Sequence, residues 1–216
     1  MIQLHYHPGN ASMAPHILLE ELGRPFELCL VDRANQAHKS AAYLRLNPNG
    51  LIPAMTDGEL VLFETAAMLL HLADTHPGAD LMPPLGSADR AHAYKWLMWL
   101  TNTLQPALIA YFYPDRWVAA GNTGGAQEVK TRAEARVGEL LDILETEFVR
   151  HGAPWTLGDR YSALDPMTFM LCRWTRGFHR PARQRPALAT FLSRMAERPA
   201  LRRVMVTEGL ADAPWY

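Results

Sequence analysis

Apolar residues near the start of the chain follow two different periods in turn. Every second residue is apolar in 2–6 and again in 26–30, which is the period of a half-buried β-strand. Between these stretches the apolar residues recur at helical spacing, with Ser12 and Pro15 near the start of the helix and Gly23 at its end. A strand, a helix and a second strand in this order predict two parallel strands joined by a helical crossover.

The next segment predicts a short helix followed by a hairpin. Ser40 can cap a short helix, which the Asn-Pro-Asn-Gly loop at 47–50 must end. Asp57 and Gly58 separate two apolar stretches and are a strong signal for a tight hairpin turn. A further helix is expected from Thr65 onward. The order β-α-β-α-β-β-α is typical of a thioredoxin-like α/β domain.

The second half of the chain has a different organisation. Residues 78–88 are rich in proline and glycine, so they are predicted to be a linker. Beyond them only helical periods occur, and Ser162 with Asp165 has the spacing of a helix capping box. The fold prediction is therefore a thioredoxin-like α/β N-terminal domain at 1–77 and an all-α C-terminal domain at 89–216.

Composition indicates a globular chain without a polyionic character. Of its 216 residues 49% are hydrophobic and 20% are charged, which is enough apolar material for a sizeable core. The 21 basic and 22 acidic residues give a net charge of -1, so nothing suggests a nucleic-acid partner. Residues 1–80 carry 4 basic and 9 acidic residues, a charge of -5, and the remainder carries +4. This asymmetry is a further sign of two units.

The sequence shows neither a membrane helix nor a secretory signal. No apolar run approaches the roughly 18–20 residues that span a bilayer, and the N-terminus lacks a basic region followed by an apolar one. The two cysteines, Cys29 and Cys172, are far apart in the sequence and fit a reducing compartment. A cytoplasmic protein without a membrane partner is expected.

A pair of histidines and an arginine-rich segment could indicate binding sites, but for both we adopt the simpler interpretation. His5 and His7 share one face of the first strand, but no cysteine or carboxylate accompanies them at ligand spacing, so no metal site is expected. Ten arginines between Arg160 and Arg203 face only two acidic residues in the sequence. Such a segment is usually a solvated basic surface, with an anion or an acidic partner as the alternative.

Four short motifs together resemble the bacterial cytosolic glutathione S-transferase family. The motifs are Pro8-Gly9-Asn10-Ala11-Ser12, Asn47-Pro48-Asn49-Gly50-Leu51-Ile52-Pro53, Glu64-Thr65 and Ser162 with Asp165. They occur in the family's order and span the chain. The resemblance implies a glutathione S-transferase fold, glutathione as co-substrate without a metal, and a small electrophile as second substrate. It also implies a homodimer in which the acidic N-terminal unit of one chain meets the helical unit of the other.

The resemblance assigns the glycyl end of glutathione and its central backbone to two loops. It implies a cis peptide between Ile52 and Pro53, which would turn the Ile52 backbone toward the cysteinyl residue of glutathione. Without the family pattern, Pro53 could equally be an edge-strand proline. His38 or Lys39 would contact the glycyl carboxylate. The sequence leaves that choice open, with a slight preference for His38, and both could instead be solvated loop residues.

The γ-glutamyl end is assigned to the start of the third helix. Unpaired amides in a first helical turn favour an anion, so Thr65 and its amide would hold the carboxylate. Glu64 would face the ammonium group. The alternative is a plain helix cap formed by Thr65. The family usually has serine here, and threonine keeps the hydroxyl.

The thiol of glutathione needs a group that stabilises its ionised form, because the thiolate is the nucleophile. Ser12, near a helix N-terminus, is the first candidate donor and Asn10 is the second. Ser12 could also be only a helix cap. Beta-class enzymes carry cysteine where this chain has Ala11, so a mixed disulfide cannot form there. Tyr6 is a weaker candidate because it alternates inward on the first strand.

The second-substrate pocket is expected along one long helix from about 89 to 113. Met98, Asn102, Gln105 and Tyr111 are the candidate lining residues on and near it. An aromatic and methionine stripe of this kind is more often core. Because a fold does not fix a function, a glutathione-transferase-like binding or regulatory protein with little turnover is the alternative to the enzyme.

Overall fold

The computed structural model describes residues 1–212 and 216, and the chain forms two compact units. The first unit combines Met1–Met82 with the C-terminal segment that begins at Ala196, and the second contains Pro83–Met195. The boundary after Met82 lies inside the predicted linker. The C-terminal segment differs from the prediction, which placed all of 89–216 in the helical domain; residues 213–215 of that range lie outside the described part.

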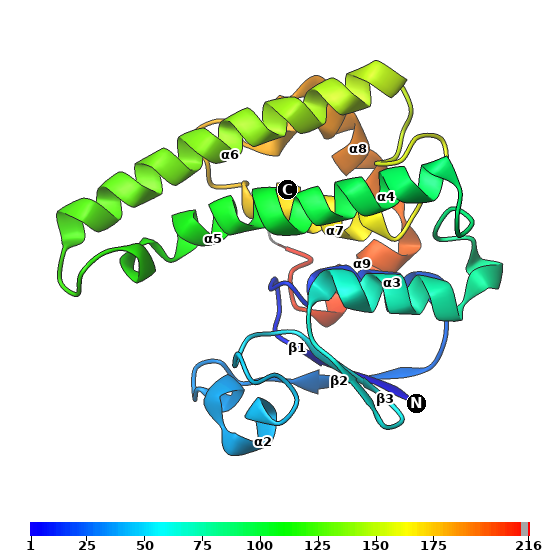
Figure 1. The fold of residues 1–216 in the computed structure, drawn as a ribbon, viewed down its shortest axis with the longest axis horizontal. Helices are drawn as coiled ribbons and strands as arrows, with labels where there is room; N and C mark the ends of the chain where they lie inside the picture. Colours follow the sequence, from blue (N-terminus) through cyan, green and yellow to red (C-terminus); the bar gives the residue numbers. More distant parts are fainter. Residues whose placement is uncertain (213–215) are drawn as a thin grey trace. The chain divides into compact units, whose positions relative to one another are not determined.

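The first unit is built on a four-stranded sheet with the order β2-β1-β3-β4. Strand β1 is parallel to β2 and antiparallel to β3, which pairs antiparallel with β4, as the thioredoxin-like prediction requires. Figure 1 labels β1, β2 and β3 of this sheet together with helices α2, α3 and α9 of the unit. Its elements are β1 (Ile2–Tyr6), α1 (Met13–Leu22), β2 (Phe26–Leu30), α2 (Ala41–Leu44), β3 (Ala54–Asp57), β4 (Leu60–Leu62), α3 (Thr65–Thr75) and α9 (Pro199–Thr207).

Helix α1 is held between the other parts of this unit by its apolar face and its acidic residues. Met13, Ile17 and Leu18 are fully buried, and Gly23 ends the helix with a positive φ of 60°. On another face, Glu21 accepts hydrogen bonds of 2.5 and 2.8 Å from the Arg198 guanidinium, just before α9. This ion pair and the packing of α9 against α1 explain why the C-terminal segment belongs to the first unit.

The second unit is all-helical, in agreement with the prediction. Figure 1 shows α6 running alongside the stretch formed by α4 and α5, and α5 packs against α6. Its helices are α4 (Ala88–Trp99), α5 (Gln105–Phe112), α6 (Thr123–His151), α7 (Leu164–Trp174) and α8 (Pro186–Glu197).

A π-helical turn at Leu100–Leu104 separates α4 from α5, where the sequence predicted one regular helix. The N–H of Gln105 bonds to the carbonyl of Leu100, five residues back. Pro106 follows directly and has no N–H for the carbonyl of Asn102. A wider turn before the proline accommodates this loss, so the segment stays helical but changes its phase.

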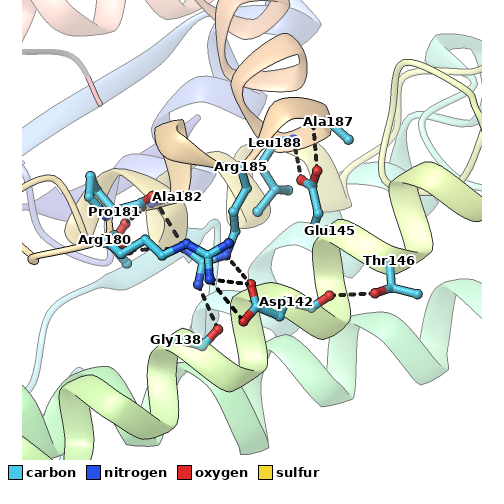
Figure 2. Close-up of polar contacts among 11 residues, drawn as sticks. Gly138, Asp142, Glu145, Thr146, Arg180, Pro181, Ala182, Arg185, Ala187 and Leu188 are labelled. Atoms are coloured by element: carbon cyan, nitrogen blue, oxygen red, sulfur yellow. Dashed lines mark hydrogen bonds and ion pairs between the residues drawn. The ribbon is translucent and has the colours of Figure 1, made fainter.

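The arginine-rich segment is only partly a solvated surface. Arg185 is 1% exposed and donates from Nε to Asp142 Oδ1 at 2.8 Å and from Nη2 to the Gly138 carbonyl at 2.8 Å, both on α6. Its Nη1 donates to the Arg180 carbonyl at 3.0 Å, as Figure 2 shows. Nearby, Glu145 accepts from the first amides of α8. The guanidinium of Arg185 therefore ties the segment before α8 to α6, so the expectation of a solvated basic surface does not hold for this arginine.

The predicted bonding between Ser162 and Asp165 is present before α7, but Ala163 rather than Ser162 occupies the cap position of the helix. Asp165 Oδ2 accepts from the Ser162 N–H at 2.7 Å and from its hydroxyl at 3.0 Å. Asp165 Oδ1 accepts from the Thr156 N–H and hydroxyl, each at 2.8 Å. Asp165 is fully buried, and this burial raises the pKa of its carboxyl to about 6 in spite of the four donors.

Candidate functional site

The loop between β1 and α1 holds both candidate thiol-activating side chains. They differ in whether a hydrogen is left to donate to a ligand. Ser12 is fully buried, and its Oγ accepts from the His7 N–H at 3.2 Å and donates to the His7 carbonyl at 3.1 Å. The single hydroxyl proton of Ser12 is therefore already used inside the loop. Asn10 is half-buried, and its Oδ1 accepts from the Ala11 N–H at 2.5 Å. Because Oδ1 is the atom engaged, the Asn10 amide nitrogen keeps two hydrogens to donate.

The start of α3 lies against this loop. Thr65 is the first residue of the helix, and its buried hydroxyl donates to the Ala11 carbonyl at 3.4 Å. The alternative of Thr65 as the helix cap is therefore wrong, since Glu64 occupies the cap position. The Glu64 side chain makes no capping bond, so the first-turn amides of α3 remain available to an anion.

Glu64 has an unusual backbone conformation. Its φ is +73° and its ψ is 110°, outside the regions that residues with a Cβ ordinarily adopt. Such conformations cost of order 1–3 kcal/mol and cluster at ligand sites. The side chain is exposed, so its carboxylate can meet a ligand beside the uncapped helix start.

The loop before β3 contains the cis peptide bond that the resemblance implies, between Ile52 and Pro53. Two side chains fix the loop through the Leu51 carbonyl, which accepts from Asn47 Nδ2 and from the Tyr43 hydroxyl, both at 2.8 Å. Burial raises the pKa of the Tyr43 phenol, which keeps it a donor. The N–H and carbonyl of Ile52 take part in none of these bonds.

The two candidates for the glycyl contact differ in charge. Burial, together with the nearby Lys39 and Arg33 cations, lowers the pKa of the His38 imidazole, which favours its neutral form. Lys39 is exposed, and its Nζ donates to the Asn49 carbonyl at 3.3 Å. A Cβ at Gly50, whose φ is +59°, would lie 2.7 Å from this Nζ, so the glycine lets the lysine approach the loop of the cis peptide.

The candidate second-substrate residues lie in the helical unit. Met98 on α4 and Asn102 in the π-helical turn are exposed, and Gln105 begins α5 half-buried. Tyr111 packs against Phe178 with ring centroids 4.2 Å apart. This aromatic contact lies within the helical unit and gives Tyr111 a packing role there.

The described residues, 1–212 and 216, offer neither a metal-binding cluster nor a membrane-spanning helix. They contain no group of three or more histidine, cysteine, aspartate or glutamate side chains that could hold a metal ion. None of the helices in this part of the chain is long and apolar enough to cross a bilayer.

Sequence reasoning missed a buried polar cluster behind the β1–α1 loop. His16 Nδ1 lies 2.8 Å from Glu208 Oε1, and both side chains are fully buried. The second carboxylate oxygen, Oε2, accepts from the Gly9 N–H at 2.7 Å. Only His16, a polar residue amid the apolar positions of its helix, hinted at a partner; Glu208 is 192 residues away.

Comparison with known proteins gives consistent matches along the chain. Residues 2–74 match the model of the glutathione S-transferase N-terminal domain. The chain is 31% identical to glutathione S-transferase GST-4.5 of Xanthomonas campestris, over 97% of this chain and 100% of that protein. A sphingomonad glutathione S-transferase solved with glutathione is 32% identical, with a TM-score of 0.82 over 97% and 100% of the two chains. A Sulfitobacter glutathione transferase homolog with bound glutathione reaches a TM-score of 0.87 at 26% identity, over 96% and 98%.

Proposed function

This chain belongs to the glutathione S-transferase family, and we propose that it is a glutathione transferase that ionises the glutathione thiol and directs it at small apolar electrophiles. The thiolate sulfur attacks an electrophilic carbon, a C–S bond forms, and the leaving group departs. We further propose a homodimer, because the charges of -5 on residues 1–80 and +4 on the rest suit contact between unlike units.

The start of α3 is the observation that carries this proposal. It combines uncapped first-turn amides, the buried Thr65 and the strained Glu64 with its exposed carboxylate. In our assignment the Thr65 amide and its neighbours hold the γ-glutamyl carboxylate, and Glu64 pairs with the ammonium group. One end of a helix thus recognises both charges of an α-amino acid group.

The remaining glutathione contacts follow from the neighbouring loops. The Ile52 backbone, next to the cis Pro53, offers its N–H and carbonyl to the cysteinyl residue. Lys39 is preferred over His38 for the glycyl carboxylate, because the lowered pKa of His38 makes it the weaker counter-charge. Met98, Asn102, Gln105 and Tyr111 remain the proposed surface for the electrophile.

For thiol activation we now favour Asn10 over Ser12. The amide nitrogen of Asn10 has hydrogens to donate, whereas the Ser12 proton is bonded to the His7 carbonyl. Ser12 then serves to fix the loop. A donor to a thiolate makes a charge-assisted hydrogen bond, which lowers the pKa of the thiol.

Asn10→Ala is expected to raise the pKa of the bound thiol by one to two units, because the variant loses a bond of roughly 1.5–3 kcal/mol to a charged group. Ultraviolet absorbance of the thiolate, followed against pH in the glutathione complex, measures this shift. Ser12→Ala is the matched variant and should change stability more than the titration. A shift in Ser12→Ala without one in Asn10→Ala would reverse the two roles.

Lys39→Ala is expected to weaken glutathione binding by about tenfold, and His38→Ala by less than threefold. A charge-assisted contact at an exposed lysine lies at the lower end of the usual range of about 1.5–3 kcal/mol. Calorimetry of both variants with glutathione tests the choice. A larger loss in His38→Ala than in Lys39→Ala would show that the neutral imidazole makes the contact instead.

A further inference from the structure

The C-terminal segment reaches the β1–α1 loop through one buried carboxylate. Glu208 follows α9, and its own N–H bonds to the Val204 carbonyl at 2.8 Å, which fixes it at the end of that helix. Each of its side-chain oxygens has one partner: His16 Nδ1 at 2.8 Å and the Gly9 N–H at 2.7 Å. A buried carboxylate is retained only where such partners compensate its desolvation.

Gly9 is the residue directly before Asn10 in the turn between β1 and α1. Its φ of +69° is a conformation that glycine adopts freely and other residues rarely do. The next amide, that of Asn10, bonds to the His7 carbonyl at 3.1 Å. The bond from Gly9 to Glu208 therefore connects the turn to the C-terminal segment, while the bonds between Ser12 and His7 lie within the loop.

The pair with His16 keeps the carboxylate in place. Because Nδ1 faces a carboxylate oxygen, which can only accept, we assign a hydrogen to Nδ1, which donates to Glu208. Nε2 is buried and has no partner among the described residues. An imidazole held in this way orients Glu208, and Glu208 in turn orients the Gly9 amide.

We propose that Glu208 is a positioning residue for thiol activation, which holds the Gly9 N–H so that the Asn10 carboxamide faces the sulfur of bound glutathione. Glu208 is not a catalytic residue, because it acts on the substrate only through the loop. The inference rests on the proposed function. It assigns the C-terminal segment a part in setting the reactivity of the glutathione thiol.

The test compares Glu208→Met, which keeps the volume but removes both acceptors, with Glu208→Gln. Glutamine can accept from the Gly9 N–H through its oxygen and, once the His16 ring moves its hydrogen to Nε2, donate to Nδ1 through its nitrogen. Glu21→Gln is the control, because it weakens the pair with Arg198 between α1 and α9 and does not touch the loop. All three variants and the wild type are measured for thiol titration in the glutathione complex, for glutathione affinity, and for hydrogen exchange of the Gly9 amide without ligand.

In Glu208→Met we expect the thiol midpoint to rise by about one pH unit, a tenfold loss of thiolate near neutral pH. The Gly9 amide should exchange at least tenfold faster, while glutathione affinity stays within threefold of the wild type. Glu208→Gln and Glu21→Gln should resemble the wild type in all three measurements. An unchanged midpoint in Glu208→Met, or an equal shift in Glu21→Gln, would overturn the proposal.

The proposal stays testable if Glu208→Met does not fold, and its failure can be distinguished from failure of the proposed function. If Glu208→Met does not fold, the Gly9 amide of the wild type decides, because exchange at the rate of an unstructured amide would contradict the bond to Glu208. Failure of the proposed function has a different signature, since the wild type itself would then bind no glutathione. Failure of this inference would leave wild-type binding and thiol ionisation intact.

Discussion

Glu64→Ala is expected to weaken glutathione binding by at least about thirtyfold. In our assignment the substitution leaves the γ-glutamyl ammonium group without its counter-charge, and breaking a desolvated charge pair costs about 2–5 kcal/mol. The lower end of this range applies because Glu64 is exposed before the ligand binds. Calorimetric titration of the variant with glutathione measures the change.

Substitution by alanine tests the charge of Glu64 without changing the strain in its backbone. Alanine and glutamate both carry a Cβ, so the strain at φ +73° is the same in the variant and the wild type. Glu59→Ala removes another exposed carboxylate, in the turn between β3 and β4, and should leave the affinity unchanged. An affinity of Glu64→Ala within twofold of the wild type would show that Glu64 does not meet the ammonium group.

The second large effect concerns stability and its dependence on pH. Burial raises the pKa of Asp165 to about 6, from 3.8 for an unperturbed carboxyl, so the folded chain binds this proton more tightly than the unfolded chain. The corresponding stabilisation is complete below pH 4 and is lost as the pH rises through 6. The loss amounts to about 3 kcal/mol of the free energy of unfolding.

Asp165→Asn provides the reference for this effect because asparagine does not titrate. The stability of the wild type relative to Asp165→Asn should fall by about 3 kcal/mol between pH 4 and pH 7, as measured by urea unfolding at each pH. Asp159→Asn, at an exposed aspartate nearby, is the control and should show a difference that changes little with pH. A constant or increasing advantage of the wild type over Asp165→Asn would contradict the raised pKa.

Local patterns in the sequence were enough to predict the elements that depend on local chemistry. The strands Ile2–Tyr6 and Phe26–Leu30 have the predicted bounds, because alternating apolar residues and Gly23 between them leave little choice of register. The box of Ser162 and Asp165 is also local, since its two residues are three apart.

Features that depend on three-dimensional contacts rather than on a local sequence pattern were not predictable in the same way. Nothing near Ser12 in the sequence indicates that its proton is bonded to the His7 carbonyl in a closed loop. The docking of the C-terminal segment on α1 involves residues about 180 positions apart, such as Glu21 and Arg198. The π-helical turn had a local signal in Pro106, a proline within a helical pattern, which is a known cause of such irregularities.

The proposed function separates into binding and turnover, which can fail independently. A protein that binds glutathione but does not conjugate any of a panel of small electrophiles would be the binding or regulatory protein considered as the alternative. Activity that falls in Asn10→Ala, with glutathione affinity retained, would support the enzyme.

The most direct test of the central claim is the titration of the glutathione thiol in the wild-type complex. Thiolate absorbance is followed against pH at saturating glutathione, with S-methylglutathione as the blank that binds but cannot ionise. We predict a midpoint at least one unit below that of free glutathione, since hydrogen bonds to a thiolate and the dipole of a helix N-terminus both favour the charged form. A midpoint equal to that of free glutathione, in a complex that calorimetry shows to be saturated, would contradict thiol activation by this protein.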